Sequence, residues 1–405
     1  MRTMIFIFVL LSFVSISFAQ SLQECADKAW DVSLKRFYSS ETHQFYDYLT
    51  SYENGKELAH LPTPEEVKQL KPKITGYDTG MEDCMISAGV LLDMLADKYA
   101  VTKDESLRKY ADEIVVGIKL SATVHGEPGF LARGVCPADG KSVYIGSSRD
   151  QYTRAVHGLW AYYRSPLCND AAKKEIAGIV KLIADRLIRN VVPENNYDSL
   201  RLDGTQDTSP DISKFWNVKP HEAARLPMIY GAAWDITGEQ KYLEQYQKYV
   251  EPAIQQSLNI NYPVSGWALL QTQGSIEVLK ALTKDAERIA ELVKIMALVS
   301  AQCAPAAKRA FETGKTLDLT ELAEDWRKPN GGITWGNAYR KVWYCIRESG
   351  EMALAQLLDE AQPFPPEQKE YLIGAIRRID YDRCSSNGIF YLQGAYWKAK
   401  RRGVL

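Results

Sequence analysis

One segment of the sequence places a carboxyl group, arginines and a histidine within about three helical turns. Ser148 and Gln151 have the spacing of an N-terminal cap and its partner, so we expect a helix to begin at Arg149. Asp150 then occupies the second helical position, and His157 lies on or near the same face. Such a set could perform acid/base work on a glycoside. The alternative is an Asp that only complements the helix dipole.

A second segment, which opens an earlier helix, could supply another carboxylate. Thr79 and Glu82 have capping-box spacing, which favours a structural role for Glu82. Asp78 lies just outside that cap and is free to point into a cleft, whereas Asp83 could complement the helix dipole. Tyr77 precedes Asp78 and is a candidate for substrate binding.

A third segment combines an aromatic ring with a possible acid/base pair. His221 and Glu222 follow Pro220, which is favourable in a first helical turn, and Trp216 lies a few residues earlier. Zinc binding through an H-E-x-x-H motif is excluded here, because Arg225 occupies the position of the second histidine. For Glu222, complementing the helix dipole remains the alternative.

Other expected helix starts carry aromatic residues. Trp267 starts one such helix, and Trp335 opens another after Gly331–Gly332, which lacks the lysine and Ser/Thr of a phosphate-binding loop. Aromatic faces suit pyranose rings, so we expect Trp216 and Trp335 to act as stacking platforms, although each aromatic residue could equally belong to the core.

The residues above must be positioned by helices, and the connections between these helices alternate between long and short. Apolar residues recur every three or four positions, as in the stretch 85–99, and this periodicity predicts helices throughout. The motif at 100–110 is weakly echoed at 235–246, as in repeated helical hairpins. Long connections at 39–78, 125–147, 191–220 and before 334 alternate with short ones near 101–103, 165–169, 237–238, 283 and 349. Antiparallel helices joined in this way place every long loop at one end of the molecule, where loops commonly carry function.

The first residues have the features of a secretory signal peptide. A basic start at Arg2, an apolar stretch at 5–13 and the small-x-small pattern at 17–19 predict cleavage after Ala19. Residues 20–405 are then expected to form a single exported domain, periplasmic or secreted. The apolar stretch is too short to span a membrane and no later one is expected to insert, so the mature chain is expected to stay out of the membrane.

Composition excludes several classes of partner. The chain has 49 basic and 51 acidic residues and a net charge of −2, which gives no electrostatic footprint for nucleic acid. Its seven cysteines lack metal-binding spacing and do not form a disulfide scaffold, so we expect most to be buried, with one or two bridges left open. We expect no metal and no cofactor, while the oligomeric state is left open.

About twelve helices in six hairpins, with all long loops at one rim, resemble the (α/α)6 toroid of six-hairpin glycosidases and of several polysaccharide lyases. The resemblance implies that alternate helices form an inner barrel whose N-terminal ends open onto a sugar-binding cleft. Exported unsaturated glucuronyl and rhamnogalacturonyl hydrolases, which share this architecture, use an acidic residue at the start of an inner helix as proton donor. Asp78 and Asp150 occupy similar topological places.

These observations lead to an expected function. We expect an exported glycoside hydrolase that acts on a neutral or uronate-containing oligosaccharide derived from a plant or host polysaccharide, with Asp150 as general acid or base and Asp78 or Glu222 as second carboxylate. Expected substrate-orienting residues are Arg133, Arg149 and His157, together with the aromatic residues Tyr77, Tyr152, Trp216 and Trp335. Two alternatives stay open. One is a lyase with Tyr152, His157 or His221 as base, and the other is a glycan-binding protein without catalysis.

Overall fold

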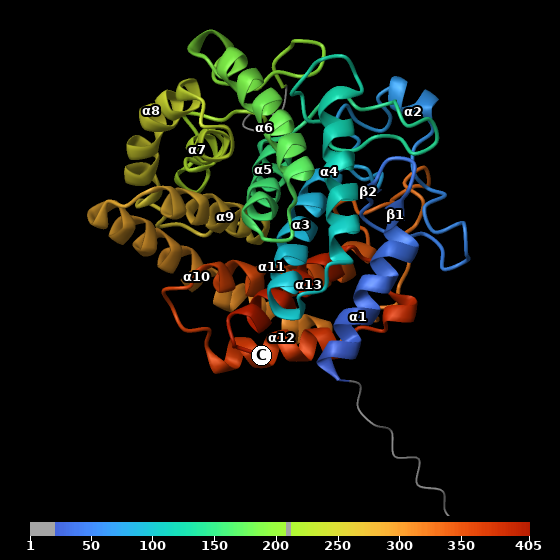
Figure 1. Cartoon of the computed structure of the whole chain (residues 1–405). Coiled ribbons are helices and arrows are strands. Elements are labelled where there is room, and N and C mark those ends of the chain that lie inside the picture. Colours follow the sequence, from blue (N-terminus) through green and yellow to red (C-terminus); the bar gives the residue numbers. More distant parts are fainter. Residues whose placement is uncertain (1–20, 208–211) are drawn as a thin grey trace, which may run out of the picture.

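The computed structural model describes residues 21–207 and 212–405 as an almost entirely helical barrel (Figure 1). The predicted signal peptide, residues 1–19, lies outside the described residues. Six helices form an inner ring: α3 (Cys84–Thr102), α5 (Arg149–Arg164), α7 (Arg225–Thr237), α9 (Gly266–Leu282), α11 (Tyr339–Leu358) and α13 (Gly388–Arg401). Each inner helix contacts the next, and α13 contacts α3, so the ring is closed.

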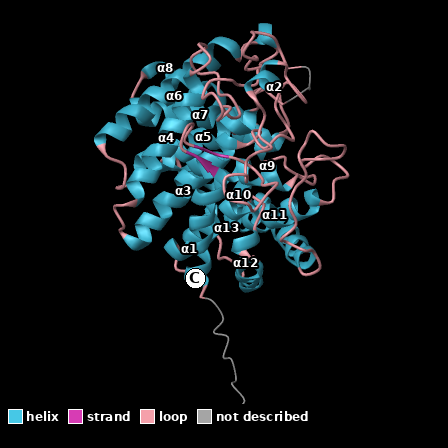
Figure 2. Cartoon of the chain, turned by 90° about the vertical axis from the view of Figure 1, so that its right-hand side faces the viewer, coloured by secondary structure: helices cyan, strands magenta, loops and turns pink. Residues whose placement is uncertain are grey.

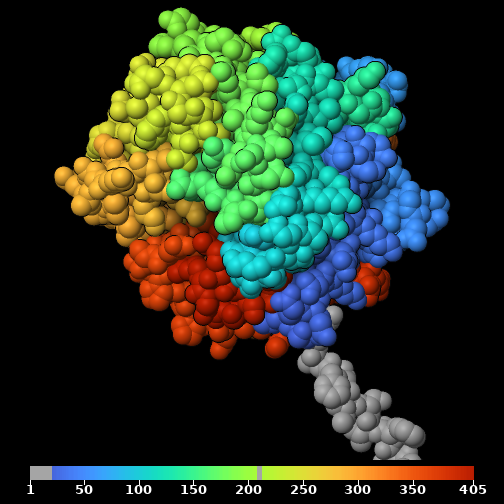
Figure 3. All heavy atoms as spheres, in the orientation of Figure 1, coloured from blue at the N-terminus to red at the C-terminus, as the bar shows by residue number. Residues whose placement is uncertain are grey.

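A second layer of helices surrounds the ring. It consists of α1 (Leu22–Val32), α4 (Leu107–Thr123), α6 (Asp170–Asn190), α8 (Gln240–Ser257), α10 (Ala286–Gly314) and α12 (Pro366–Arg378). Each outer helix packs on an inner one, with α1 against α13. In Figure 3 the hairpins follow one another around the molecule, and the first helix lies beside the last segments of the chain.

The remaining elements are short and belong to the connections. They are a π-helical turn (Ser33–Phe37), β1 (Tyr38–Ser39), β2 (Gln44–Phe45), α2 (Pro64–Lys68) and 3-10 turns at Pro193–Asn195, Pro220–Glu222 and Tyr381–Arg383. The two strands pair antiparallel, with Tyr38 opposite Phe45. Long loops gather at one end of the barrel, as Figure 2 shows. The predicted all-α toroid with one elaborate rim is therefore confirmed, and α2 is an additional small helix within the first long connection.

Inner helices approach one another closely because glycines lie where they cross. A Cβ added to Gly89 of α3 would lie 2.0 Å from the backbone oxygen of Arg154 in α5. A Cβ on Gly158 of α5 would lie 2.4 Å from the oxygen of Gly89. These two helices thus meet backbone to backbone, which fixes the position of the N-terminal end of α5 relative to that of α3.

Two expectations about composition can be compared with the structure. All seven cysteines lie within the described residues, and each is buried and unpaired, as expected for small apolar core residues. Helix α10 was not expected to resemble a membrane span, but its length and mean hydropathy of 1.4 would allow one. In this fold α10 packs against α9 and α11, and 33% of its most apolar window is buried there.

The glycine contact between α3 and α5 generates a stability prediction. Gly89→Ala should lower the free energy of unfolding by about 3 kcal/mol, because the backbone of α5 would have to move. Gly178→Ala is the matched control, since Gly178 lies in outer helix α6 with nothing within 4 Å of an added Cβ. That change should raise stability by about 0.5–1 kcal/mol. Urea unfolding followed by circular dichroism measures both, and equal stability of Gly89→Ala and wild type would contradict the prediction.

Candidate functional site

A cavity of about 480 Å³ lies at the rim where the inner helices begin. Its charged lining consists of the carboxylates Asp83, Asp150 and Glu222 and the arginines Arg133, Arg149, Arg340 and Arg347. Its aromatic lining consists of Tyr77, Trp267, Trp335, Trp343 and Tyr344. Paired charges and several ring faces in one concave site are typical of a small-molecule or sugar site.

Asp150 lies where the sequence predicts it, at the second position of α5. Its carboxylate forms an ion pair with Arg225, the first residue of α7, whose side chain is fully buried. The Asp150 side chain keeps 22% of its surface exposed, more than the other two carboxylates of the cavity. A carboxylate fixed by a buried guanidinium and still open to the cavity is suited to proton transfer.

Glu222 also lines the cavity, at the end of the 3-10 turn before α7. It pairs with Arg149, which in addition donates to the backbone oxygen of Lys214. His221 lies beside this pair, with Nε2 3.8 Å from Oε1 of Glu222 and Nδ1 2.9 Å from the Tyr262 hydroxyl. Burial lowers the pKa of His221 to about 4, so its ring is neutral at neutral pH.

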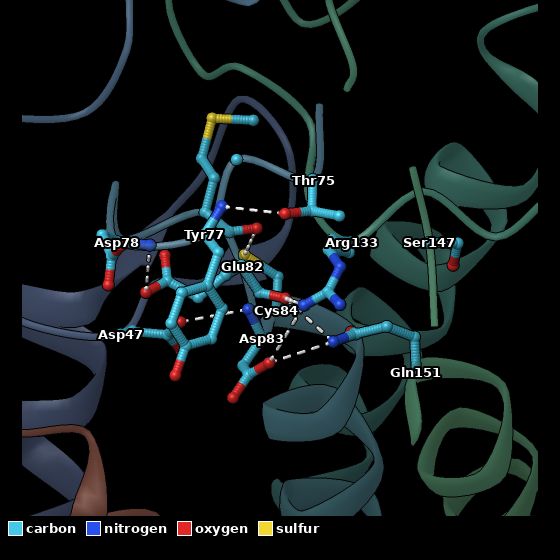
Figure 4. Close-up of polar contacts among 12 residues, drawn as sticks. Asp47, Thr75, Tyr77, Asp78, Glu82, Asp83, Cys84, Arg133, Ser147 and Gln151 are labelled. Carbon is cyan, nitrogen blue, oxygen red and sulfur yellow. Dashed lines mark hydrogen bonds and ion pairs between the residues drawn. The ribbon is translucent and has the colours of Figure 1, made fainter. Parts of the chain in front are cut away.

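Asp83 is the carboxylate with partners from the most distant parts of the chain. Arg347 of α11 donates to it at 2.9 Å. Gln151 of α5 donates to it at 3.1 Å, as Figure 4 shows. Nη1 of Arg133 lies 3.8 Å from the same carboxylate. The backbone N–H of Asp83 donates to the side chain of Asp47 at 3.0 Å. The sequence suggested only a helix-dipole role for Asp83, whereas the structure makes it part of the cavity wall.

Behind Asp83 lie two buried carboxyl groups. Glu82 accepts from the backbone N–H of Asp78 at 3.2 Å and from that of Gly80 at 2.6 Å. Burial, together with the charges of Asp83 and Asp78, raises the pKa of Glu82 to about 8. Burial likewise raises the pKa of Asp47 well above its ordinary value. A pKa of about 8 means that Glu82 holds its proton at neutral pH.

The structure does not bring Asp78 to the cavity. Its backbone adopts a left-handed conformation with φ 79°, which an Asp tolerates in a tight turn. Its buried side chain pairs with Lys73, and Figure 4 shows it on the far side of Glu82 from Arg133 and Gln151. The turn therefore points the Asp78 carboxylate away from the cleft, which corrects the expectation that it supplies the second carboxylate.

Four other predicted site residues also lie away from the cavity lining, namely His221, described above, and three more. His157 is seven residues beyond Asp150, about 10 Å further along α5, and its Nε2 lies 2.7 Å from Glu277. Tyr152 is fully buried and accepts a hydrogen bond from the backbone N–H of Leu131. Trp216 packs edge-on against Tyr249 at 4.7 Å between ring centroids.

The aromatic wall combines predicted and unpredicted residues. Trp335 is 82% exposed, and the guanidinium of Arg340 lies 3.9 Å from the centroid of its ring. Tyr77 and Trp267 also lie in the cavity, as their positions before or at helix starts suggested. Trp343, Tyr344 and the arginines of α11 gave no sequence signal, because long helical side chains reach back toward the N-terminal end of their helix.

Within residues 21–207 and 212–405, no group of three or more His, Cys, Asp or Glu side chains is arranged to hold a metal ion.

Comparisons with known proteins extend the assignment of the fold. No protein-family model matches the chain, and no curated protein matches its sequence. Among solved structures, a sugar epimerase from a ruminal bacterium superposes with a TM-score of 0.52 at 12% identity, covering 93% of this chain and 98% of the other. A family 76 glycoside hydrolase from a bovine Bacteroides thetaiotaomicron strain gives a TM-score of 0.50 at 13% identity, covering 93% and 78%.

Identities this low show the fold alone. The likeness to both solved proteins extends over nearly the whole of this chain. The resemblance inferred from the alternating connections is thus confirmed at the level of architecture: the chain is an (α/α)6 toroid, and no single family within that fold is assigned.

Proposed function

We propose that this protein is an exported carbohydrate-active enzyme, a glycoside hydrolase that cleaves an oligosaccharide by carboxylate acid/base catalysis. The observation that carries the proposal is one cavity lined by three carboxylates and three tryptophans. Sugar hydrolysis needs a pair of carboxyl groups, and pyranose rings bind to aromatic faces. The activities named for the two solved toroids, sugar epimerisation and glycoside hydrolysis, support carbohydrate chemistry in this fold. Export is proposed from residues 1–19 alone.

Asp150 is the proposed proton-transfer residue, because it is the most exposed carboxylate of the cavity. Glu222 is the proposed second carboxylate. It lies on the same wall, and Arg149 of α5 holds it as Arg225 of α7 holds Asp150. Asp83 is the third carboxylate at the cavity and the alternative to Glu222. The four partners of Asp83 give it a fixed position. Catalysis requires such a fixed position of both the proton-transfer residue and the second carboxylate.

Elimination by a lyase is less well supported by the positions of the candidate bases. Tyr152 and His157 are hydrogen-bonded inside the protein and do not line the cavity. Tyr77 does line it, but burial and the nearby Asp83 and Glu82 raise the pKa of its hydroxyl, which makes the phenolate base scarce. His221 is neutral and is the remaining base candidate, although it too lies outside the lining.

The first test is a product assay on neutral and uronate-containing oligosaccharides. Asp150→Asn should lower kcat/KM by about 10²–10⁴-fold while the fold is retained, because proton transfer contributes about that much. The control Asp170→Asn alters an exposed first-turn Asp of outer helix α6 and should leave activity unchanged. Glu222→Gln and Asp83→Asn then identify the second carboxylate.

Reducing ends, ultraviolet absorbance and isomerisation of free sugars are followed together. New reducing ends without new absorbance support hydrolysis. Rising absorbance would establish a lyase, and interconversion of a free sugar without bond cleavage would establish an epimerase. Sugar binding without turnover by the wild type, on every sugar tested, would leave a binding protein.

The exposed Trp335 generates a prediction about binding. Trp335→Ala should raise KM about tenfold with little effect on kcat, because it removes a stacking surface from the cavity. Trp216→Ala is the contrasting variant, since Trp216 packs on Tyr249 away from the cavity lining. It should lower thermal stability and leave KM unchanged. A raised KM in Trp216→Ala alone would reverse the two roles.

The buried Glu82 makes stability depend on pH. Its pKa rises from an ordinary 4.5 to about 8 on folding, so the folded protein keeps a proton that the unfolded chain releases. The contribution of Glu82 to stability is therefore complete below pH 4.5 and is lost as the pH rises to about 8.

Accordingly, the urea midpoint of the wild type should fall more steeply between about pH 5 and pH 8 than that of Glu82→Gln. Glu66→Gln is the control. A hydrogen bond from Arg327 lowers the pKa of Glu66 to about 2, so its contribution is lost only as the pH falls below 4.5. That variant should shift the midpoint by a constant amount over the same range. Parallel curves for wild type and Glu82→Gln would contradict the assignment.

A further inference from the structure

The arginines of the cavity differ in whether they have a carboxylate partner. Four arginines line it but only three carboxylates do, and Asp150 is already paired with a fifth arginine, Arg225. Glu222 pairs with Arg149, and Asp83 pairs with Arg347. Arg347 also pairs with the buried carboxylate of Glu351 at 2.9 Å, and Nη1 of Arg133 lies 3.8 Å from Asp83. Among the described residues, Arg340 is therefore the lining arginine left without a carboxylate partner, and an anionic ligand could supply one.

Arg340 differs from the other three arginines that line the cavity. Among the described residues none forms an ion pair with it, although its side chain is buried, with only 6% of the residue exposed. Nη1 donates to the backbone oxygen of Ile333 at 2.6 Å, while Nε has no hydrogen-bond partner. A buried guanidinium with an unused donor is costly unless a ligand completes it.

The surroundings of Arg340 hold it in one position. Its guanidinium lies 3.9 Å from the ring centroid of Trp335 and 5.1 Å from that of Tyr344. Arg133, elsewhere in the lining, also has an unpartnered Nε, and its Nη1 donates to the backbone oxygen of Glu82 at 3.2 Å. A planar donor fixed between aromatic rings suits bidentate binding of an oxyanion.

We propose that Arg340 forms a subsite for an oxyanion carried by the sugar, a uronate carboxylate or a sulfate ester, next to the ring that stacks on Trp335. The proposal rests on the proposed function for the sugar itself and adds the class of substrate. A neutral sugar could accept hydrogen bonds from Arg340 but would leave its buried charge uncompensated, so a charged sugar should bind more tightly than its neutral counterpart.

Calorimetric titration tests the subsite independently of turnover. The sugars are a uronate-containing oligosaccharide, its carboxyl-reduced counterpart, and the sulfate ester of an otherwise neutral oligosaccharide. All titrations use the Asp150→Asn variant as background, so that the sugar is not consumed. The background should bind a charged sugar about tenfold more tightly than the reduced one. Arg340→Gln should abolish this preference and leave affinity for the reduced sugar unchanged.

Two further variants separate the subsite from a general loss of structure. Arg340→Lys keeps the charge without the bidentate geometry and should retain part of the preference. Arg164→Gln is the matched control, because Arg164 lies 5.0 Å from the Trp160 ring centroid but is paired with Asp235. It should retain the whole preference. A preference limited to the sulfated sugar and dependent on Arg340 would support the subsite and identify its anion as sulfate.

Equal binding of charged and reduced sugars before any change to Arg340 would overturn the proposal, as would a preference that survives in Arg340→Gln. Absence of turnover with the Arg340-dependent preference intact would overturn the proposed hydrolysis and leave the subsite standing.

Discussion

Closure of the inner ring, where α13 meets α3, is the constraint on which the rest of this structure depends. The fully buried ammonium of Lys398 in α13 lies 3.2 Å from Asp93 and 2.9 Å from Asp97, both in α3. Burial alone would lower the pKa of Lys398, but the two carboxylates outweigh it and raise that pKa. Loss of either partner would leave an uncompensated buried charge, a strongly destabilising change. The ion pairs thus hold the first and last inner helices together.

The contact between α13 and α3 also brings together the residues at the rim of the barrel. Asn387, just before α13, donates to Asp47, and Asp47 accepts from the backbone N–H of Asp83. Asp83 in turn accepts from Arg347, which is 264 residues away in the sequence. The cavity is therefore built from the first, middle and last hairpins together. Its geometry should be lost as a unit when the ring opens, because no single hairpin contains a complete set of partners.

These large separations along the sequence explain which features the sequence could predict and which it could not. Alternating connection lengths are local and identified the toroid, while the spacing of Ser148 and Gln151 predicted the start of α5 at Arg149 and the position of Asp150. Spacing rules failed where a partner comes from another hairpin. Ser148 makes no side-chain cap, and the Gln151 amide instead binds Asp83. Glu82 caps no helix at Thr79, because α3 begins only at Cys84 and Glu82 binds the preceding turn. Arg340 and Arg347 could not be assigned at all without the position of α11.

Several buried charges of the inner ring have carboxylate partners, whereas Arg340 has none among the described residues. Away from the cavity, Lys398 pairs with Asp93 and Asp97, Arg401 pairs with Asp97 at 2.6 Å, and His157 binds Glu277. Each of these groups thus has a carboxylate partner within the protein, so its role in the fold is sufficient reason for its presence. Arg340 at the rim is buried but lacks such a carboxylate among the described residues. Arg154 of α5 is likewise fully buried and has no ion-pair partner among the described residues, but it does not line the cavity. Arg340 does line it, so there a ligand can supply the missing partner.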